Sequence, residues 1–147
     1  MQLQIQYFGT IWAKGEFTIE GADFKPYADL HAKIAGAVSQ AVTLPEAKMV
    51  NKSLADEMKA LLGNAGWSNI HRINIVDKDW WINRTSGGNS PVKSRHIAAA
   101  ALAKDGGGYY YKVCTFQQDR LISGGFGKLH LSHQGAKVPV PARNINK

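Results

Sequence analysis

Residues 90–116 read SPVKSRHIAAAALAKDGGGYYYKVCTF, and the fold class depends on how this stretch is interpreted. Ser90 is a good helix N-cap, and Pro91 suits the first helical position because an N–H has no intrahelical partner there. Residues 97–103 are mostly alanine, the residue with the highest helix propensity. We therefore predict a helix from Pro91 to Lys104, which the three glycines at 106–108 bring to an end.

The segments around this predicted helix have the composition of strands. Residues 109–116 are aromatic and β-branched, and residues 128–132 follow the glycine-rich segment 123–127. On the other side, residues 70–76 form a β-branched run, and residues 77–79 are a plausible turn into residues 80–83. Neighbouring strands of this kind are predicted to pair as hairpins.

The first third of the chain combines both periodicities. Residues 2–7 alternate strictly between polar and apolar, which predicts a hairpin covering residues 2–20. After Pro26 the apolar residues recur every three or four positions, which predicts a helix near residues 26–42. A second helix is predicted to open at Ser53, with Asp56 as the acid of a capping box, and to end at residues 63–66. Residues 43–52 fit either a loop or a short helical turn.

Together these elements predict an α+β fold. We expect a mostly antiparallel sheet of about five to six hairpin-linked strands, with two or three helices packed on one face. Residues 1–133 are expected to form a single domain, because 147 residues with 44% hydrophobic content suit one core. Residues 134–147 contain two prolines and no acidic residue, and are expected to be an extended or flexible basic C-terminal tail.

The positive charge of the chain is concentrated in its second half. Residues 1–67 hold six Lys/Arg and seven Asp/Glu, a net charge of −1, whereas residues 68–147 hold twelve and four, a net charge of +8. A basic half that also contains Trp80, Trp81 and three consecutive tyrosines is typical of a surface that meets polyanions. Nucleic acid is therefore the first partner class that the sequence indicates.

Composition also indicates the compartment in which the protein is expected. The sequence has no apolar run near the roughly 20 residues that cross a bilayer, and it begins without a recognisable signal peptide. Cys114 is the only cysteine, which excludes an intrachain disulfide and fits a reducing compartment. We expect a soluble, cytoplasmic protein with no membrane partner and no cofactor.

A loop before the predicted helix is the best local candidate for an anion site. Glycines ahead of a helix N-terminus let backbone N–H groups close on a phosphate or carboxylate, and nearby cations add charge. The predicted anion-binding residues are Arg84, Gly87, Gly88, Ser90, Lys93 and Arg95. The segment matches neither the P-loop nor the dinucleotide-binding fingerprint. The alternative is an ordinary capped helix with solvated basic residues in its first turns.

Aromatic residues provide a second candidate. Consecutive strand residues point to opposite faces, so at least one Trp and one Tyr should face away from the core. The predicted stacking or interface residues are Trp80, Trp81, Tyr109 and Tyr111, beside a basic surface of Lys112, Arg120 and Lys128. Exposed rings can stack bases while cations hold phosphates. The alternative is that helices or a second subunit cover the outer rings.

Signals for catalysis or metal binding are incomplete. Asp77 and Asp79 lack an obvious third carboxylate, so no metal site is predicted. His130 and His133 would point to opposite faces of a regular strand, which disfavours zinc. A histidine general base, as in metal-free ribonucleases, remains open, with His96, His130 and Glu16 or Glu20 as candidates by residue type alone. Cys114, between hydrophobic neighbours, is expected to be a buried, inert thiol.

Three classes of function remain. The first is a nucleic-acid or other polyanion binder that uses the basic second half. The second is a small enzyme that binds a phosphorylated or carboxylated metabolite at the helix N-terminus near Ser90. The third is a homodimeric or other assembly protein without catalysis, whose outer aromatic rings are covered. The sequence favours the first, because the charge asymmetry is a property of the whole half-chain. It leaves open whether the protein is an enzyme.

Overall fold

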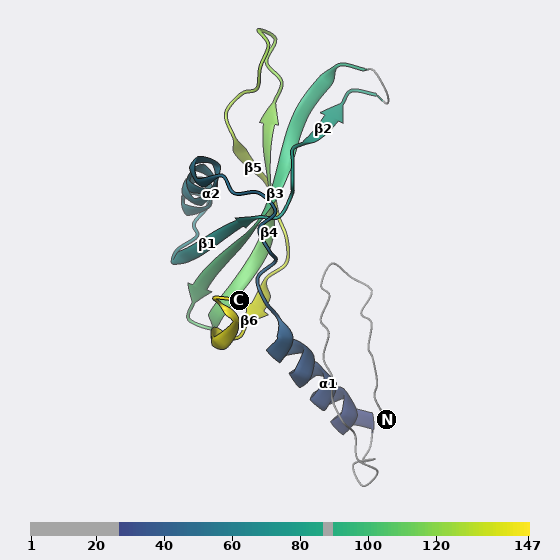
Figure 1. Ribbon diagram of the computed structural model, residues 1–147, viewed down its shortest axis with the longest axis vertical. Coiled ribbons are helices and arrows are strands. Elements are labelled where there is room, and N and C mark those ends of the chain that lie inside the picture. Colours follow the sequence, from purple (N-terminus) through teal and green to yellow (C-terminus); the bar gives the residue numbers. More distant parts are fainter. Residues whose placement is uncertain (1–26, 87–89) are drawn as a thin grey trace.

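The computed structural model describes residues 27–86 and 90–147, which form an α+β structure with one six-stranded antiparallel sheet (Figure 1). The predicted hairpin over residues 2–20 lies outside the described residues. The elements are α1 (Tyr27–Ala41), α2 (Lys52–Asn64), β1 (Ile70–Ile75), β2 (Trp81–Arg84), β3 (Val92–Asp105), β4 (Gly108–Asp119), β5 (His130–Gln134), β6 (Val138–Val140) and a 3-10 helix at Ala142–Asn144. Four strands lie in the order β1-β3-β4-β5, with β2 also on β3 and β6 also on β4.

The helix predicted from Pro91 to Lys104 is wrong, because residues 92–105 form β3, the longest strand described. β3 is central, and pairs with β4 along one side and with β1 and β2 along the other. Its side chains alternate between two buried environments, and Ala99, Ala100 and Ala101 are all 0% exposed. Helix propensity differs among ordinary residues by less than about 1 kcal/mol each, so the pairing and burial of a central strand outweigh it.

The glycines that were predicted to end a helix instead turn the β3–β4 hairpin. Asp105 pairs with Gly108 at the last position of the ladder. Gly108 has φ +112°, a conformation that favours glycine, and the Gly107 N–H donates to Asp105 Oδ1 at 2.9 Å. Lys137 also bonds to this carboxylate, and this hydrogen bond is the main cause of the lowered pKa of Asp105.

One face of the sheet is covered by α2, which supplies the first of two hydrophobic clusters. Its buried side chains pack on alternate residues of β3 and β4; the cluster comprises Leu54, Met58, Leu62, Ile75, Ile97, Ala99, Ala101, Cys114, Phe116 and Leu129. The N-cap of this helix lies two residues before the predicted one. Asn51 is the N-cap, and its side chain accepts from the Leu54 N–H at 3.0 Å, so the predicted role of Ser53 as the cap is wrong.

The opposite face, here called the second face, is covered in part by chain from both ends of the described region. The cluster comprises Leu44, Ala100, Leu102, Tyr111 and Val140. β6, which pairs with Tyr109–Tyr111 of β4, and the 3-10 helix both belong to the segment predicted to be an extended or flexible tail. Asn144 is buried, and its Nδ2 donates to the carbonyls of Gln40 and Val42 at 2.9 Å each.

The helix predicted near residues 26–42 is present as α1, but it does not cover the sheet. It contacts β6, and Figure 1 shows it leading away from the strands. Val38, from its predicted apolar stripe, is 38% exposed. The helical periodicity of residues 26–42 was therefore sufficient to predict α1. It did not predict whether α1 packs on the sheet.

Candidate nucleic-acid interface

Two strand connections meet at one end of the sheet, where β2 leads into β3 and β4 leads into β5 (Figure 1). The register requires this, because Val92 pairs with Arg84 and Ser94 pairs with Asp119. The Arg120 N–H also donates to the Lys93 carbonyl at 2.9 Å, which ties the two connections together. Residues 80–96 and 117–130 hold five basic residues and a single acidic one, Asp119. We call this set the cationic end: Arg84, Lys93, Arg95, Arg120 and Lys128.

Arg95 is the most constrained cation of this end. Its guanidinium carbon lies 4.2 Å from the ring centroid of Trp80 and 4.2 Å from that of Phe126. Its Nε donates to Gln118 Oε1 at 2.8 Å. Arg120 contacts the same Phe126 ring at 5.3 Å. Arginine held on aromatic faces is fixed in direction, and its planar fork of N–H donors matches phosphate oxygens.

The terminal guanidinium nitrogens of Arg95 remain available for a ligand. Among the described residues, Gln118 is its one hydrogen-bond acceptor, and that bond uses Nε. No described carboxylate forms a salt bridge with Arg95 or Arg120, since the described ion pairs are Lys52 with Asp56 and Lys137 with Asp105. Asp119 instead accepts from Gln117 Nε2 at 2.8 Å. The positive charge of this end is therefore not neutralised by the neighbouring acid.

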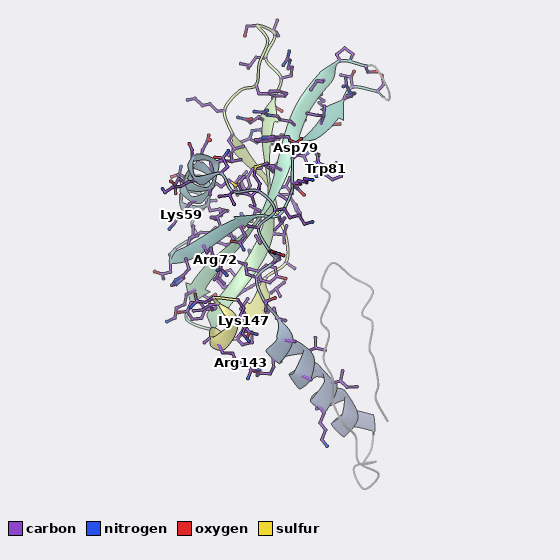
Figure 2. The ribbon with its side chains drawn as sticks, in the orientation of Figure 1. Lys59, Arg72, Asp79, Trp81, Arg143 and Lys147 are labelled. Atoms are coloured by element: carbon purple, nitrogen blue, oxygen red, sulfur yellow. The ribbon has the colours of Figure 1, made fainter. Side chains whose placement is uncertain are left out.

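β2 presents aromatic and apolar side chains at the edge of the sheet. All four of its residues are exposed; Trp81 is 61% exposed and Ile82 is 48% exposed. Trp81 pairs with His96, whereas Ile82 pairs with Arg95, so the two side chains flank the strand on opposite faces. Figure 2 shows Trp81 at the start of β2, beside the connection that carries Asp79. An exposed indole on an edge strand is suited to stacking on a base.

The residues of the predicted anion site have different surroundings from those expected. Because β3 replaces the helix, Ser90 is not a helix N-cap, and the helix dipole that supported the site does not exist there. The Arg84 Nη1 donates to the Ser90 carbonyl at 2.7 Å, and Lys93 is exposed. Gly87 and Gly88 lie outside the described residues. Arg84, Lys93 and Arg95 nevertheless come together at the cationic end, by strand register rather than on a helix.

The predicted aromatic residues separate into different environments. Trp80 and Trp81 lie at the cationic end. Tyr111 is only 4% exposed, and burial raises its pKa. Tyr109 is half-buried and contacts the His71 ring edge-on at 5.2 Å, with the Lys104 ammonium 5.3 Å from its centroid.

The predicted basic surface is likewise divided. Arg120 and Lys128 belong to the cationic end, and Lys128 is exposed. Lys112 lies further along β4, with its ammonium 5.3 Å from the Trp67 ring. Trp67 in turn contacts Tyr110, at 5.8 Å between ring centroids. Lys112 and its aromatic neighbours thus form a separate cluster.

Phe126 and Gln118 are the residues of this end that sequence reasoning missed. Phe126 is the one aromatic residue within the glycine-rich segment 123–127, and that isolation is a weak sequence signal. Its contact with Arg95 depends on the bridge between Arg120 and Phe126, which no local pattern reveals. Gln118 is found only through its pairing with Arg95.

Histidines gather on the second face, just across the sheet from Arg95. His96 on β3 pairs with Gln117 on β4, and Gln117 pairs with His130 on β5. With Trp81 these residues form one row across four strands, here called the histidine row. A register shift in β5 also pairs His133 with Thr115, two residues from Gln117. The prediction that His130 and His133 point to opposite faces is therefore wrong, because a bulge changes the alternation.

The acidic residues near this end accept hydrogen bonds from the backbone, and the thiol is buried. Asp77 Oδ2 accepts from the Ala98 N–H at 2.7 Å, and Asp79 Oδ1 accepts from the Trp80 N–H at 2.7 Å. Within residues 27–86 and 90–147, no group of three or more His, Cys, Asp or Glu is arranged to hold a metal ion. Burial raises the pKa of the Cys114 thiol to about 11, so the thiolate that would act as a nucleophile is disfavoured.

None of the described helices combines the length and apolarity required to cross a bilayer. No known protein family, no curated protein and no solved structure matches this chain.

Proposed function

We propose that the protein binds single-stranded nucleic acid at the cationic end. The main observation in support of this proposal is the constrained side chain of Arg95. Two aromatic rings and Gln118 hold its guanidinium, while its terminal nitrogens have no described protein partner. Such a group loses little conformational freedom when it binds a phosphate.

The surrounding residues extend this contact to more than one phosphate. Arg120 shares the Phe126 ring with Arg95, and Lys93 is joined to Arg120 through the backbone. Cations spaced along two adjacent connections are suited to a chain of phosphates, and each contact releases a condensed counterion. Trp81, exposed on the edge strand β2, is the stacking partner that we assign to a base. A single strand has unpaired bases that can reach such a ring.

The test is fluorescence anisotropy with labelled strands of about twelve nucleotides, single-stranded and double-stranded, at about 50 and 200 mM salt. Arg120→Ala and Lys93→Ala should each weaken binding to single strands and reduce the salt slope by about 1. Trp81→Phe should remove most of the tryptophan quenching that accompanies binding. Heparin, a polyanion without bases, is the comparison ligand.

Matched controls come from cations away from the cationic end. Figure 2 shows Lys59 on α2, and Arg143 near the C-terminus. Lys59→Ala and Arg143→Ala remove the same charges and should leave the affinity and the salt slope unchanged. The proposal fails if the wild type does not bind single strands at low salt. It also fails if the controls weaken binding as much as the two variants do, or if heparin binds as tightly as the strand and quenches tryptophan emission to the same extent.

A further inference from the structure

We propose that the histidine row cleaves single-stranded RNA, with His96 and His130 as a general acid and base. This inference rests on the proposed function, since the RNA must first be bound. It goes beyond binding, because it assigns a reaction to His96 and His130 on the second face, two residues that the binding proposal does not use.

The register places the two imidazoles at a suitable separation. His96 and His130 stand on β3 and β5, with β4 between them, and Gln117 pairs with both. Neighbouring strands are about 4.8 Å apart, so the two backbones lie about 10 Å from each other. In phosphoryl transfer the attacking and leaving oxygens lie on opposite sides of phosphorus. Two imidazoles on one face with one strand between them can therefore reach one oxygen each.

Both imidazoles have nitrogens that are available to a substrate. Each histidine is half-buried, and neither makes a hydrogen bond or a ring contact with any other described residue. Histidine is the side chain that exchanges protons near neutral pH, and it serves most often as a general acid or base. Neither imidazole is therefore held by a hydrogen bond or ring contact to another described residue.

The neighbours in the row suit an RNA strand. Trp81, which is 61% exposed, pairs with His96 at the edge and offers its ring to a base. Gln117 lies between the histidines, and its Nε2 is bound to Asp119, which leaves its carbonyl oxygen for a ribose hydroxyl. Lys128, two residues before His130, is exposed. It adds a cation near the end of the row for the phosphate.

The reaction needs no co-reactant. One imidazole, in its neutral form, takes the proton of the ribose 2′-hydroxyl, and the 2′-oxygen attacks the adjacent phosphorus. A bond from the 2′-oxygen to phosphorus forms, and the bond from phosphorus to the 5′-oxygen breaks. The second imidazole, in its protonated form, gives its proton to the leaving 5′-oxygen. The products are a 2′,3′-cyclic phosphate and a new 5′-hydroxyl end, and one proton has moved from one imidazole to the other.

The experiment compares two strands of the same sequence, RNA and its 2′-O-methyl analogue, incubated with the full chain in buffer that contains EDTA. We expect the RNA to be cut with 2′,3′-cyclic phosphate ends, whereas the analogue is bound and stays intact. His96→Gln and His130→Gln should each slow cleavage by about 100-fold or more. Their affinity for the analogue should stay within about twofold of the wild type, since neither histidine belongs to the cationic end.

The control variant is His71→Gln, because His71 is an exposed histidine on β1, outside the row. It should cleave at the wild-type rate, and a thermal melt of each variant checks that the fold is retained. The inference is overturned if the wild type binds both strands but cuts neither, or if EDTA abolishes cleavage. It is also overturned if either row variant cuts as fast as the wild type. If neither strand binds, the proposed function fails together with it.

Discussion

Arg95 and His96 are neighbours in sequence, yet they take part in different surfaces. Arg95 shares a face with Gln118 and contacts Trp80 and Phe126, whereas His96 shares the other face with Gln117. The separation follows from the alternation of side chains in a strand. In the predicted helix these two residues would have lain about 100° apart around one axis, so the separate roles proposed for them depend on β3 being a strand.

The packing around Ala101 requires a small side chain. Ala101 is 0% exposed and belongs to the cluster beneath α2. Ala101→Leu should lower the free energy of unfolding by about 1–3 kcal/mol, because extra methyl groups in a packed core force neighbours to shift. Urea unfolding followed by circular dichroism measures this. Ala60→Leu, which adds the same atoms at an exposed position of α2, should change stability by less than about 0.5 kcal/mol.

Cys114 links burial to stability at alkaline pH. Burial raises the pKa of its thiol to about 11 from the usual 9.0, with Lys112 opposing the shift. A raised folded-state pKa stabilises the fold below the unfolded-state value, and this contribution is lost as pH rises towards 11. The melting temperature of the wild type should therefore fall more steeply between pH 8 and 11 than that of Cys114→Ala. Equal slopes would show that ionisation of this thiol is not linked to unfolding.

The same thiol should be slow to react in the folded protein. Native protein at neutral pH should react slowly with a disulfide reagent, because the reactive thiolate is disfavoured and Cys114 is 0% exposed. The reaction should become fast in denaturant. Fast labelling of the native protein would contradict the assigned burial.

At the scale of elements, α2 offers a direct comparison between two polar residues at its start. Asn51 caps the helix in the structure, whereas the sequence pattern favoured Ser53. Asn51→Ala should cost about 1 kcal/mol of stability, since it leaves the Leu54 N–H without its acceptor. Ser53→Ala should cost much less, because Ser53 is exposed within the first turn. Chemical denaturation of both variants checks the order, and the reverse order would support the capping box.

β3 shows why local propensity was a poor guide at the centre of the sheet. An alanine-rich run favours helix when it is considered alone. In the fold, the small side chains of Ala99 and Ala100 let α2 approach one face and the Leu44 and Val140 side chains approach the other. Strands buried on both faces do not alternate between polar and apolar, so the usual period-two signal was absent. Residues 70–76 and 109–116, which carry β-branched and aromatic residues, were predicted as strands, and β1 and β4 confirm both.

For the whole molecule, the C-terminal segment acts as a clamp on the chain between α1 and the sheet. Asn144 is 3% exposed and donates to the carbonyls of Gln40 and Val42. Asn144→Ala should cost about 1–3 kcal/mol, because the buried Asn144 amide makes two hydrogen bonds that alanine cannot replace. It should also speed hydrogen exchange in residues 40–46, measured by mass spectrometry. Asn146→Ala, at an exposed position, is the control. Unchanged exchange in Asn144→Ala would show that the clamp does not hold this segment.

Composition and periodicity were enough to predict the fold class and part of the candidate site. The α+β class, both described helices and the strands predicted at residues 70–76 and 109–116 follow from short-range patterns, whereas β3 was wrongly predicted as a helix. The clustering of Arg84, Lys93, Arg95 and Arg120 did not, because it depends on which strands pair and in which register. The Phe126 contact and the bulge that realigns His133 are also non-local. A single sequence contains no direct record of such contacts.

The two-sided burial of β3 makes the spacing of its residues more important than their chemistry. A substitution among the alanines changes one contact. An inserted or deleted residue between Arg95 and the turn would instead make the side chains on one side of the change point to the opposite face of the sheet. Either the residues now under α2 would face Leu44 and Val140, or the arginine would move to the face that carries His130. Variation in natural or engineered relatives of this chain should therefore conserve the length from Val92 to Asp105 even where the residues differ.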